Sequence, residues 1–196
     1  MKKITLLLLF VFGISYSQEI KRDKIIDLEP SMRIGVVLPI HFGDNILSKE
    51  FNNNIGFNTN FSFIKIYDLK LSFGFEYQKY NETNSSIGII NHINKYSYSI
   101  QSDYTINLNP KYAIIPFVNY AYTDLNFKNS IDIIAKQKGN EIRIGSYLDY
   151  KLNNTFSMYV GFNYYKLFND IKASSQDKKY YGTSDAFQIS LGIELN

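Results

Sequence analysis

Long runs in which apolar and polar residues alternate are the feature that most constrains this chain. The period of the alternation is two, whereas a helix would repeat its apolar residues at about 3.6. Eight such runs predict eight strands, at residues 32–40, 55–63, 69–78, 96–106, 112–124, 142–151, 156–165 and 187–195. Most of the runs approach the ~9–11 residues that a tilted strand needs to cross a bilayer, whereas soluble strands average about 5–6.

The segments between these strands alternate strictly in length. Long polar loops are expected at residues 41–54, 80–95, 125–141 and 168–185, and tight turns at 67–68, 107–110 and 153–154. Short periplasmic turns and longer external loops are typical of bacterial membrane barrels. The pattern therefore predicts an all-β protein: an eight-stranded antiparallel up-and-down transmembrane β-barrel, with both termini in the periplasm.

One of the predicted strands is ambiguous. In the run 112–124, Ile114 and Val118 share one face, but Ile115 and Phe117 lie on the other. Pro116 interrupts this run, and a proline cannot donate a hydrogen bond to a ladder. We expect a bulge at this position.

The first residues have the features of an export signal. Residues 1–17 combine a basic start, an apolar run over residues 4–14 and a small-x-small ending, which predicts a cleaved signal peptide. The run is shorter than the ~20 apolar residues of a spanning helix, although a short membrane anchor is the alternative. Residues 18–31 are charged and aperiodic, and we interpret them as a short periplasmic arm before the barrel at 32–196.

Composition excludes several classes of function. The chain has no cysteine, which excludes disulfides, zinc thiolate sites and a lipoprotein anchor. Its formal net charge is +3, to which Lys2 and Lys3 of the leader contribute two charges. The remaining balance gives no reason to expect a nucleic-acid partner.

Motifs for catalysis, metal binding or a cofactor are not found in the sequence. The two histidines, His41 and His92, fall in expected external loops without a second ligand at i+4. We interpret both as solvated loop residues and expect neither catalytic nor metal-binding residues. The alternative is a lipid-modifying enzyme with a histidine near the outer rim.

The polar face of the strands is expected to point inward. Glycines fall on this face in six strands, at Gly35, Gly56, Gly74, Gly145, Gly161 and Gly192. An eight-stranded barrel has room only for packed side chains, so small residues relieve crowding there. Tyrosines near both ends of the apolar face match the two interfacial bands of a membrane barrel. The alternative is a soluble exported binding barrel, whose faces would be inverted.

Eight charged residues fall in the inward register: Arg33, Lys70, Glu76, Asp103, Arg143, Asp149, Lys151 and Glu194. Charges in a narrow interior must be paired or hydrated. We interpret them as a structural network that fills the barrel; the alternative is a small gated pore. Arg33 and Glu194 lie in the first and last strands near the same rim, so we predict a contact between them across the closing seam.

The layout resembles the small outer-membrane barrels of the OmpA/OmpX type over residues 32–196. The resemblance lies in topology and alternation, and the chain departs from the usual aromatic last residue by ending at Leu195-Asn196. It implies assembly by the barrel-assembly machinery and contact with outer-membrane lipid and lipopolysaccharide. It also implies a non-enzymatic protein that displays four polar loops at the cell surface, for interaction with a partner that the sequence does not identify or for envelope integrity.

Overall fold

The computed structural model describes residues 26–83, 90–129, 132–172 and 174–196. The expected signal peptide and the first part of the expected arm lie outside these residues. Ten strands are described: β1 (Ile26–Phe42), β2 (Phe51–Asn53), β3 (Gly56–Ile66), β4 (Leu69–Glu82), β5 (His92–Tyr104), β6 (Ile106–Asn107), β7 (Tyr112–Lys128), β8 (Ile133–Lys151), β9 (Phe156–Asn169) and β10 (Thr183–Leu195). Two short helices, α2 (Ile46–Glu50) and α3 (Ser175–Gly182), interrupt them.

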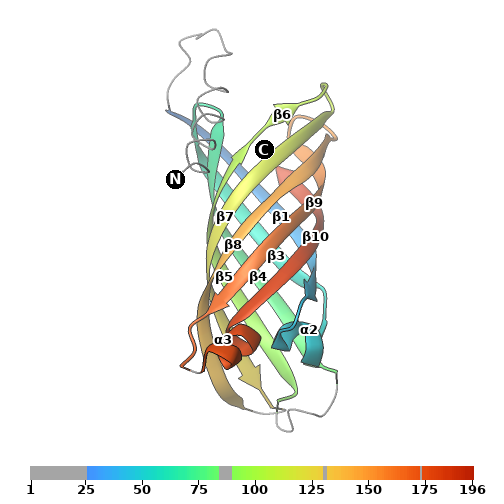
Figure 1. Ribbon diagram of the computed structural model, residues 1–196. Coiled ribbons are helices and arrows are strands. Elements are labelled where there is room, and N and C mark those ends of the chain that lie inside the picture. Colours follow the sequence, from blue (N-terminus) through green and yellow to red (C-terminus); the bar gives the residue numbers. More distant parts are fainter. Residues whose placement is uncertain (1–25, 84–89, 130–131, 173) are drawn as a thin grey trace.

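Eight of the strands form a closed antiparallel ring in the order β1, β3, β4, β5, β7, β8, β9, β10 (Figure 1). The ring closes where β1 pairs with β10 over eleven residue pairs, from Met32 opposite Leu195 to Phe42 opposite Asp185. The short strands β2 and β6 pair with β4 and β7. The predicted eight-stranded up-and-down barrel is therefore confirmed.

The two ends of the barrel differ. At the turn end, the Asn109 and Asn153 side chains each accept hydrogen bonds from backbone N–H groups two and three residues further on, which closes both turns. The C-terminus lies at this end as well (Figure 1). At the opposite end, which we call the loop end, α2 and α3 occupy parts of the expected loops. Neither helix of the described chain is long and apolar enough to cross a membrane.

The outer face carries the apolar register. Its middle is aliphatic and phenylalanine-rich, and Phe63 stacks on Phe73 with ring centroids 5.3 Å apart. Tyrosine pairs lie toward the two ends: Tyr77 with Tyr96 near the loop end, and Tyr112 with Tyr150 at the turn end. The interior carries the polar register, so the predicted inversion of the faces is present.

Several expected strand boundaries are wrong. β1 begins at Ile26, so residues 26–31 belong to the barrel wall and not to an arm. The expected loop 125–141 is mostly strand, because β7 continues to Lys128 and β8 starts at Ile133. The expected strands end where the apolar residues of the outer face give way to polar ones. In the structure, backbone pairing continues past that point.

The expected bulge at Pro116 is also wrong. Pro116 lies on the outer face directly opposite Ser146, and the β7–β8 register is continuous there. Ile115 and Phe117 are buried in the interior. On the other side of β7, the neighbouring strand is interrupted at Thr105, between β5 and β6. The missing N–H of the proline therefore falls beside a break in the partner strand and needs no bulge.

Candidate functional site: the ion-paired interior of the barrel

The interior is narrow because adjacent strands bring backbone and large side chains close to its axis. Gly35 and Gly192 are directly opposite at the seam, and a Cβ atom on either would collide with the hydroxyl of Tyr159 and with the backbone across the seam. Tyr159 itself is fully buried. Glycine is required at both positions because the Tyr159 ring and the backbone of the neighbouring strand occupy the space that a Cβ atom would need.

A first layer of buried charges lies toward the turn end. The Nε atom of Arg33 is 2.8 Å from Oε2 of Glu194, and its Nη1 atom is 2.8 Å from Oδ2 of Asp103. The predicted contact across the seam is therefore present, between residues that are direct partners in the β1–β10 register. Lys70 adds a second cation, 3.7 Å from Oε1 of Glu194. Two cations and two carboxylates thus balance in this layer.

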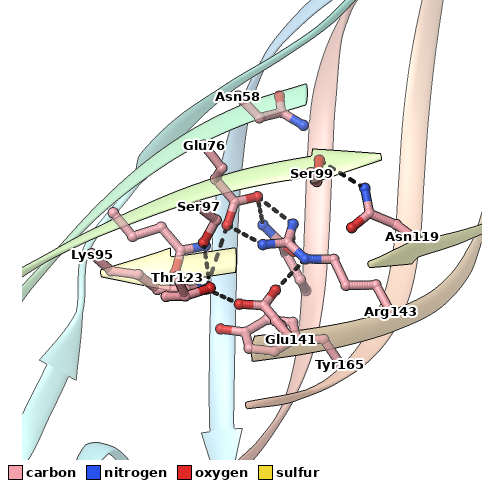
Figure 2. A network of polar contacts seen from close by, with 12 residues as sticks. Asn58, Glu76, Lys95, Ser97, Ser99, Asn119, Thr123, Glu141, Arg143 and Tyr165 are labelled. Atoms are coloured by element: carbon pink, nitrogen blue, oxygen red, sulfur yellow. Dashed lines mark hydrogen bonds and ion pairs between the residues drawn. The ribbon is translucent and has the colours of Figure 1, made fainter. Parts of the chain in front are cut away.

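A second layer lies nearer the loop end (Figure 2). Arg143 donates from Nη1 and Nη2 to the two carboxylate oxygens of Glu76, at 2.5 and 2.7 Å. Lys95 Nζ lies 2.7 Å from Oε2 of Glu141 and 3.6 Å from Oε1 of Glu76, and Arg143 Nε contacts Glu141. Gln188 donates a further hydrogen bond to Glu76. This layer is also neutral, since it again holds two cations and two carboxylates.

The structure places seven of the eight sequence-predicted charges inside the barrel, where all seven are buried. Six of them form the ion pairs of the two layers. Asp149 is buried near the turn end, and its Oδ1 atom has no hydrogen-bond partner among the described residues. Lys151 is exposed at the rim and takes part in neither layer.

Sequence reasoning missed two members of the second layer, Lys95 and Glu141. Both fall in expected loops, yet both are almost completely buried. Each continues the inward register of its strand by one step, ahead of Ser97 and Arg143 respectively. The period-two alternation of β5 and β8 continues through Lys95 and Glu141, and following it past the apolar residues would identify both as inward-facing.

The interpretation of His41 as a solvated loop residue is wrong. It lies in β1, points inward and is buried. Its Nδ1 atom is 2.7 Å from Ser184 Oγ, and its Nε2 atom is 3.3 Å from the hydroxyl of Tyr80 and 3.2 Å from that of Tyr165. The residue simply continues the inward register of Arg33, Gly35 and Val37 past the expected strand end. His92 starts β5, where it is half-exposed on the outer face.

An apolar plug, also missed from the sequence, closes the interior at the loop end. Asn45 caps α2 by accepting a hydrogen bond from Ser48 N at 3.0 Å, and the helix then directs Ile46 and Leu47 into the barrel. Six further buried residues complete the plug: Phe51, Tyr80, Ile93, Leu125, Phe127 and Leu167. Burial of these side chains fixes the helix across the mouth of the barrel.

The open space inside the barrel differs between its middle and its turn end. One internal cavity of about 20 Å³ lies among Asn58, Gln101, Arg143 and neighbouring polar residues. A larger cavity of about 380 Å³ opens at the turn end, beside Lys70, Asp149 and Lys151. Within the described residues, no group of three or more His, Cys, Asp or Glu side chains is placed to hold a metal ion.

Comparison with known proteins identifies the family. A model of the family described as "Type IX secretion system membrane protein PorP/SprF" matches residues 10–193. The chain belongs to the PorP/SprF family. No curated protein matches it significantly.

Solved structures show the same fold at low sequence identity. The PorP/SprF chain is similar to Neisserial surface protein A, with a TM-score of 0.60 and 9% identity over 85% of this chain and 96% of that one. It is similar to Ail of Yersinia pestis, solved with the heparin analogue sucrose octasulfate, with a TM-score of 0.53 and 14% identity over 86% and 99% of the chains. The outer membrane protein AlkL gives 0.50 and 12% over 91% and 94%. These likenesses confirm the resemblance to small outer-membrane barrels, and the protein is an outer-membrane β-barrel.

Proposed function

We propose that this PorP/SprF barrel is a sealed, non-enzymatic component of the outer-membrane part of a type IX secretion system. In this proposal the chain is exported by a cleaved signal peptide and inserted by the barrel-assembly machinery. Both termini lie in the periplasm, and the loop end, with its four connections, faces the cell surface. The protein then acts through its surfaces, as a membrane-fixed platform for partners, and not through its lumen.

The observation that carries the proposal is the filled interior. Two neutral charge layers and an apolar plug occupy the barrel axis, and the cavity between them, at about 20 Å³, has room for about one water molecule. A conducting pore would need a continuous hydrated path, which wider barrels of 16–18 strands provide. The six sequence-predicted charges that form the two layers therefore serve, in this proposal, as structural filling and not as a gate.

The geometry around His41 argues against a hydrolase. Asn45 Nδ2 donates to the carbonyl of Phe42, so its Oδ1 atom accepts from the Ser184 hydroxyl at 3.1 Å. The hydroxyl proton of Ser184 is therefore used in the hydrogen bond to Asn45. In the bond between His41 and Ser184, His41 Nδ1 must then be the donor and Ser184 Oγ the acceptor. A histidine base for a serine nucleophile needs the opposite arrangement. The pair also lies inside the barrel beneath α2, away from the outer face.

Two measurements test the proposal. Purified protein in planar lipid bilayers should show no stable conductance steps, whereas a 16-stranded porin measured in parallel should. Deletion of the gene should reduce release of type IX cargo, and a chain carrying His41→Phe should restore release because no catalytic step depends on that residue. Steady conductance by the intact barrel would contradict a sealed lumen, and unchanged cargo release in the deletion strain would contradict a role in secretion.

A further inference from the structure

A cluster of basic side chains lies on the outer face of the barrel at the loop end. It spans four strands that are consecutive in the ring, β4, β5, β7 and β8. We call it the basic face, and it consists of Lys79, His92, Lys128, Lys136 and Lys138. Nothing in the interior network or the proposed sealing role uses these residues.

Strand register places these side chains outward and close to one another. Their chain neighbours Tyr80, Ile93 and Phe127 are buried inside, so alternation turns the basic residues out. His92 is directly opposite Lys128 between β5 and β7, and adjacent strands are about 4.8 Å apart. Lys79 and Lys128 both act electrostatically on His92.

Few carboxylates neutralise this face. Asp124 is opposite Lys138 in the β7–β8 register, and Asp132 lies at the tip of the same hairpin. Among the described residues, no ion pair joins any of the four lysines to an acid. The opposite side of the rim differs, because Lys166 on β9 lies 3.6 Å from Asp185 on β10. The basic face therefore keeps an excess of positive charge.

The height of the basic face above the membrane zone indicates its ligand. It begins just beyond the outward tyrosines Tyr77, Tyr96 and Tyr122, and tyrosine bands mark the level of lipid headgroups. Lysines at this level meet the phosphates of anionic lipids, and they bind phosphate as point charges. The two exposed lysines of β8, Lys136 and Lys138, extend the face away from the bilayer along the projecting hairpin.

We propose that the basic face binds the phosphate groups of one lipopolysaccharide molecule in the outer leaflet. The inference rests on the proposed orientation, with the loop end outside. The β4–β8 sector would then carry a lipid bound by charge, while the β9–β10 side of the rim stays free of it. The bound lipid would thereby fix which side of the barrel faces bulk membrane and which is available to protein partners.

A binding titration tests the proposal on the intact barrel in detergent micelles. Fluorescently labelled protein is titrated with diphosphoryl lipid A at two salt concentrations. The test variant carries Lys79→Gln, Lys128→Gln, Lys136→Gln and Lys138→Gln. The matched control removes four loop-end lysines from α2 and the β9–β10 connection instead: Lys49→Gln, Lys172→Gln, Lys178→Gln and Lys179→Gln. Heat-modifiable migration on gels shows which variants are folded.

The test variant should bind lipid A at least ten-fold more weakly and lose most of its salt dependence, while the control binds like the unmodified protein. Dephosphorylated lipid A should bind weakly to all three proteins, and inorganic phosphate should compete only at high concentration. If the glutamine variant does not fold, the corresponding four arginine substitutions keep the charge and should bind normally. Equal binding by test and control variants, or by lipid with and without phosphate, would overturn the proposal. A loop end found in the periplasm would contradict the proposed function and leave the measured binding intact.

Discussion

At the scale of single residues, the interior is organised by local neutrality. In each charge layer the ion pairs join two cations to two carboxylates, and Asp149 is buried beside the first layer. Removing one partner of a buried ion pair leaves an uncompensated charge, which typically costs about 3–5 kcal/mol. Replacing both partners by apolar residues is often close to neutral. This asymmetry gives the layers a measurable signature.

We expect Lys95→Met to destabilise the barrel by about 3–5 kcal/mol, because it leaves Glu141 and Glu76 with only Arg143 as a cation. The double variant Lys95→Met/Glu141→Leu should recover most of this loss, since the two-pronged Glu76–Arg143 pair then remains in a neutral layer. Urea unfolding in lipid vesicles measures both free energies. A double variant that is less stable than the single variant would contradict local neutrality as the organising rule.

Residue-level prediction from sequence succeeded where strand identity was clear and failed where strand ends were misjudged. Arg33 and Glu194 were placed correctly because each lies well inside an alternating run, and antiparallel closure then fixes their contact. His41, Lys95 and Glu141 fall in expected loops, because a polar residue next to a polar segment looks like the end of a strand. At these three positions the polar side chain lies in the inward register, which continues beyond the membrane zone.

At the scale of elements, alternation determined the facing of the strands but not their length. Residues 125–141 are rich in lysine, asparagine and glutamine, which is typical of a loop, yet β7 and β8 pair through most of this segment. The strands can project beyond the bilayer because the backbone ladder satisfies its own hydrogen bonds in water as well as in lipid. The helix α2 could not be foreseen, since its five residues are too few to show a helical period.

The facing of β4 can be tested with one substitution. Phe73 is 55% exposed on the outer face and packs against Phe63. Phe73→Arg should destabilise the barrel folded in lipid by about 2–4 kcal/mol, which is the cost of an arginine near the midplane of a membrane barrel. Phe73→Leu is the control and should fold nearly as well as the unmodified chain. Folding yield into vesicles, read from heat-modifiable migration, distinguishes them; a silent arginine would place Phe73 away from lipid.

At the scale of the whole molecule, the two ends of the barrel have different constructions. Tight asparagine-stabilised turns form one end, and longer connections with two helices and the basic face form the other. In the proposed function the axis is sealed, so partners would meet the barrel at these end surfaces and along its outer wall. The orientation of the barrel in the membrane is therefore the property on which partner access depends.

Orientation can be measured with a cleavable tag. A protease site inserted in the β7–β8 connection, between Asn129 and Asp132, should be cut on intact cells. The same site in the turn at Asn153 and Asn154 should be protected until the outer membrane is permeabilised. Asp132, Asn153 and Asn154 are all exposed, so we expect neither insertion to prevent folding. Cleavage of the second site alone on intact cells would reverse the proposed orientation.

The closing seam joins the two ends of the described chain and depends on every other strand being in register. Val36 on β1 and Leu191 on β10 are direct partners on the outer face. The chain has no cysteine, so Val36→Cys with Leu191→Cys introduces one unambiguous pair. Cross-strand partners have Cβ atoms about 4.5–5.5 Å apart, somewhat more than the ~3.5–4.5 Å of a disulfide, so a small local adjustment suffices for the bond.

We expect oxidation to form this disulfide within a monomer and to stabilise the barrel by about 3–5 kcal/mol, because the bond closes a loop longer than ~100 residues in the unfolded chain. The control pairs Val36→Cys with Ile144→Cys, which lies on β8 and is not adjacent to β1 in the ring. Mobility on non-reducing gels and the urea midpoint before and after reduction give the result. Equal oxidation of the two cysteine pairs, or dimers instead of locked monomers, would show that β1 and β10 do not form a stable seam in the membrane.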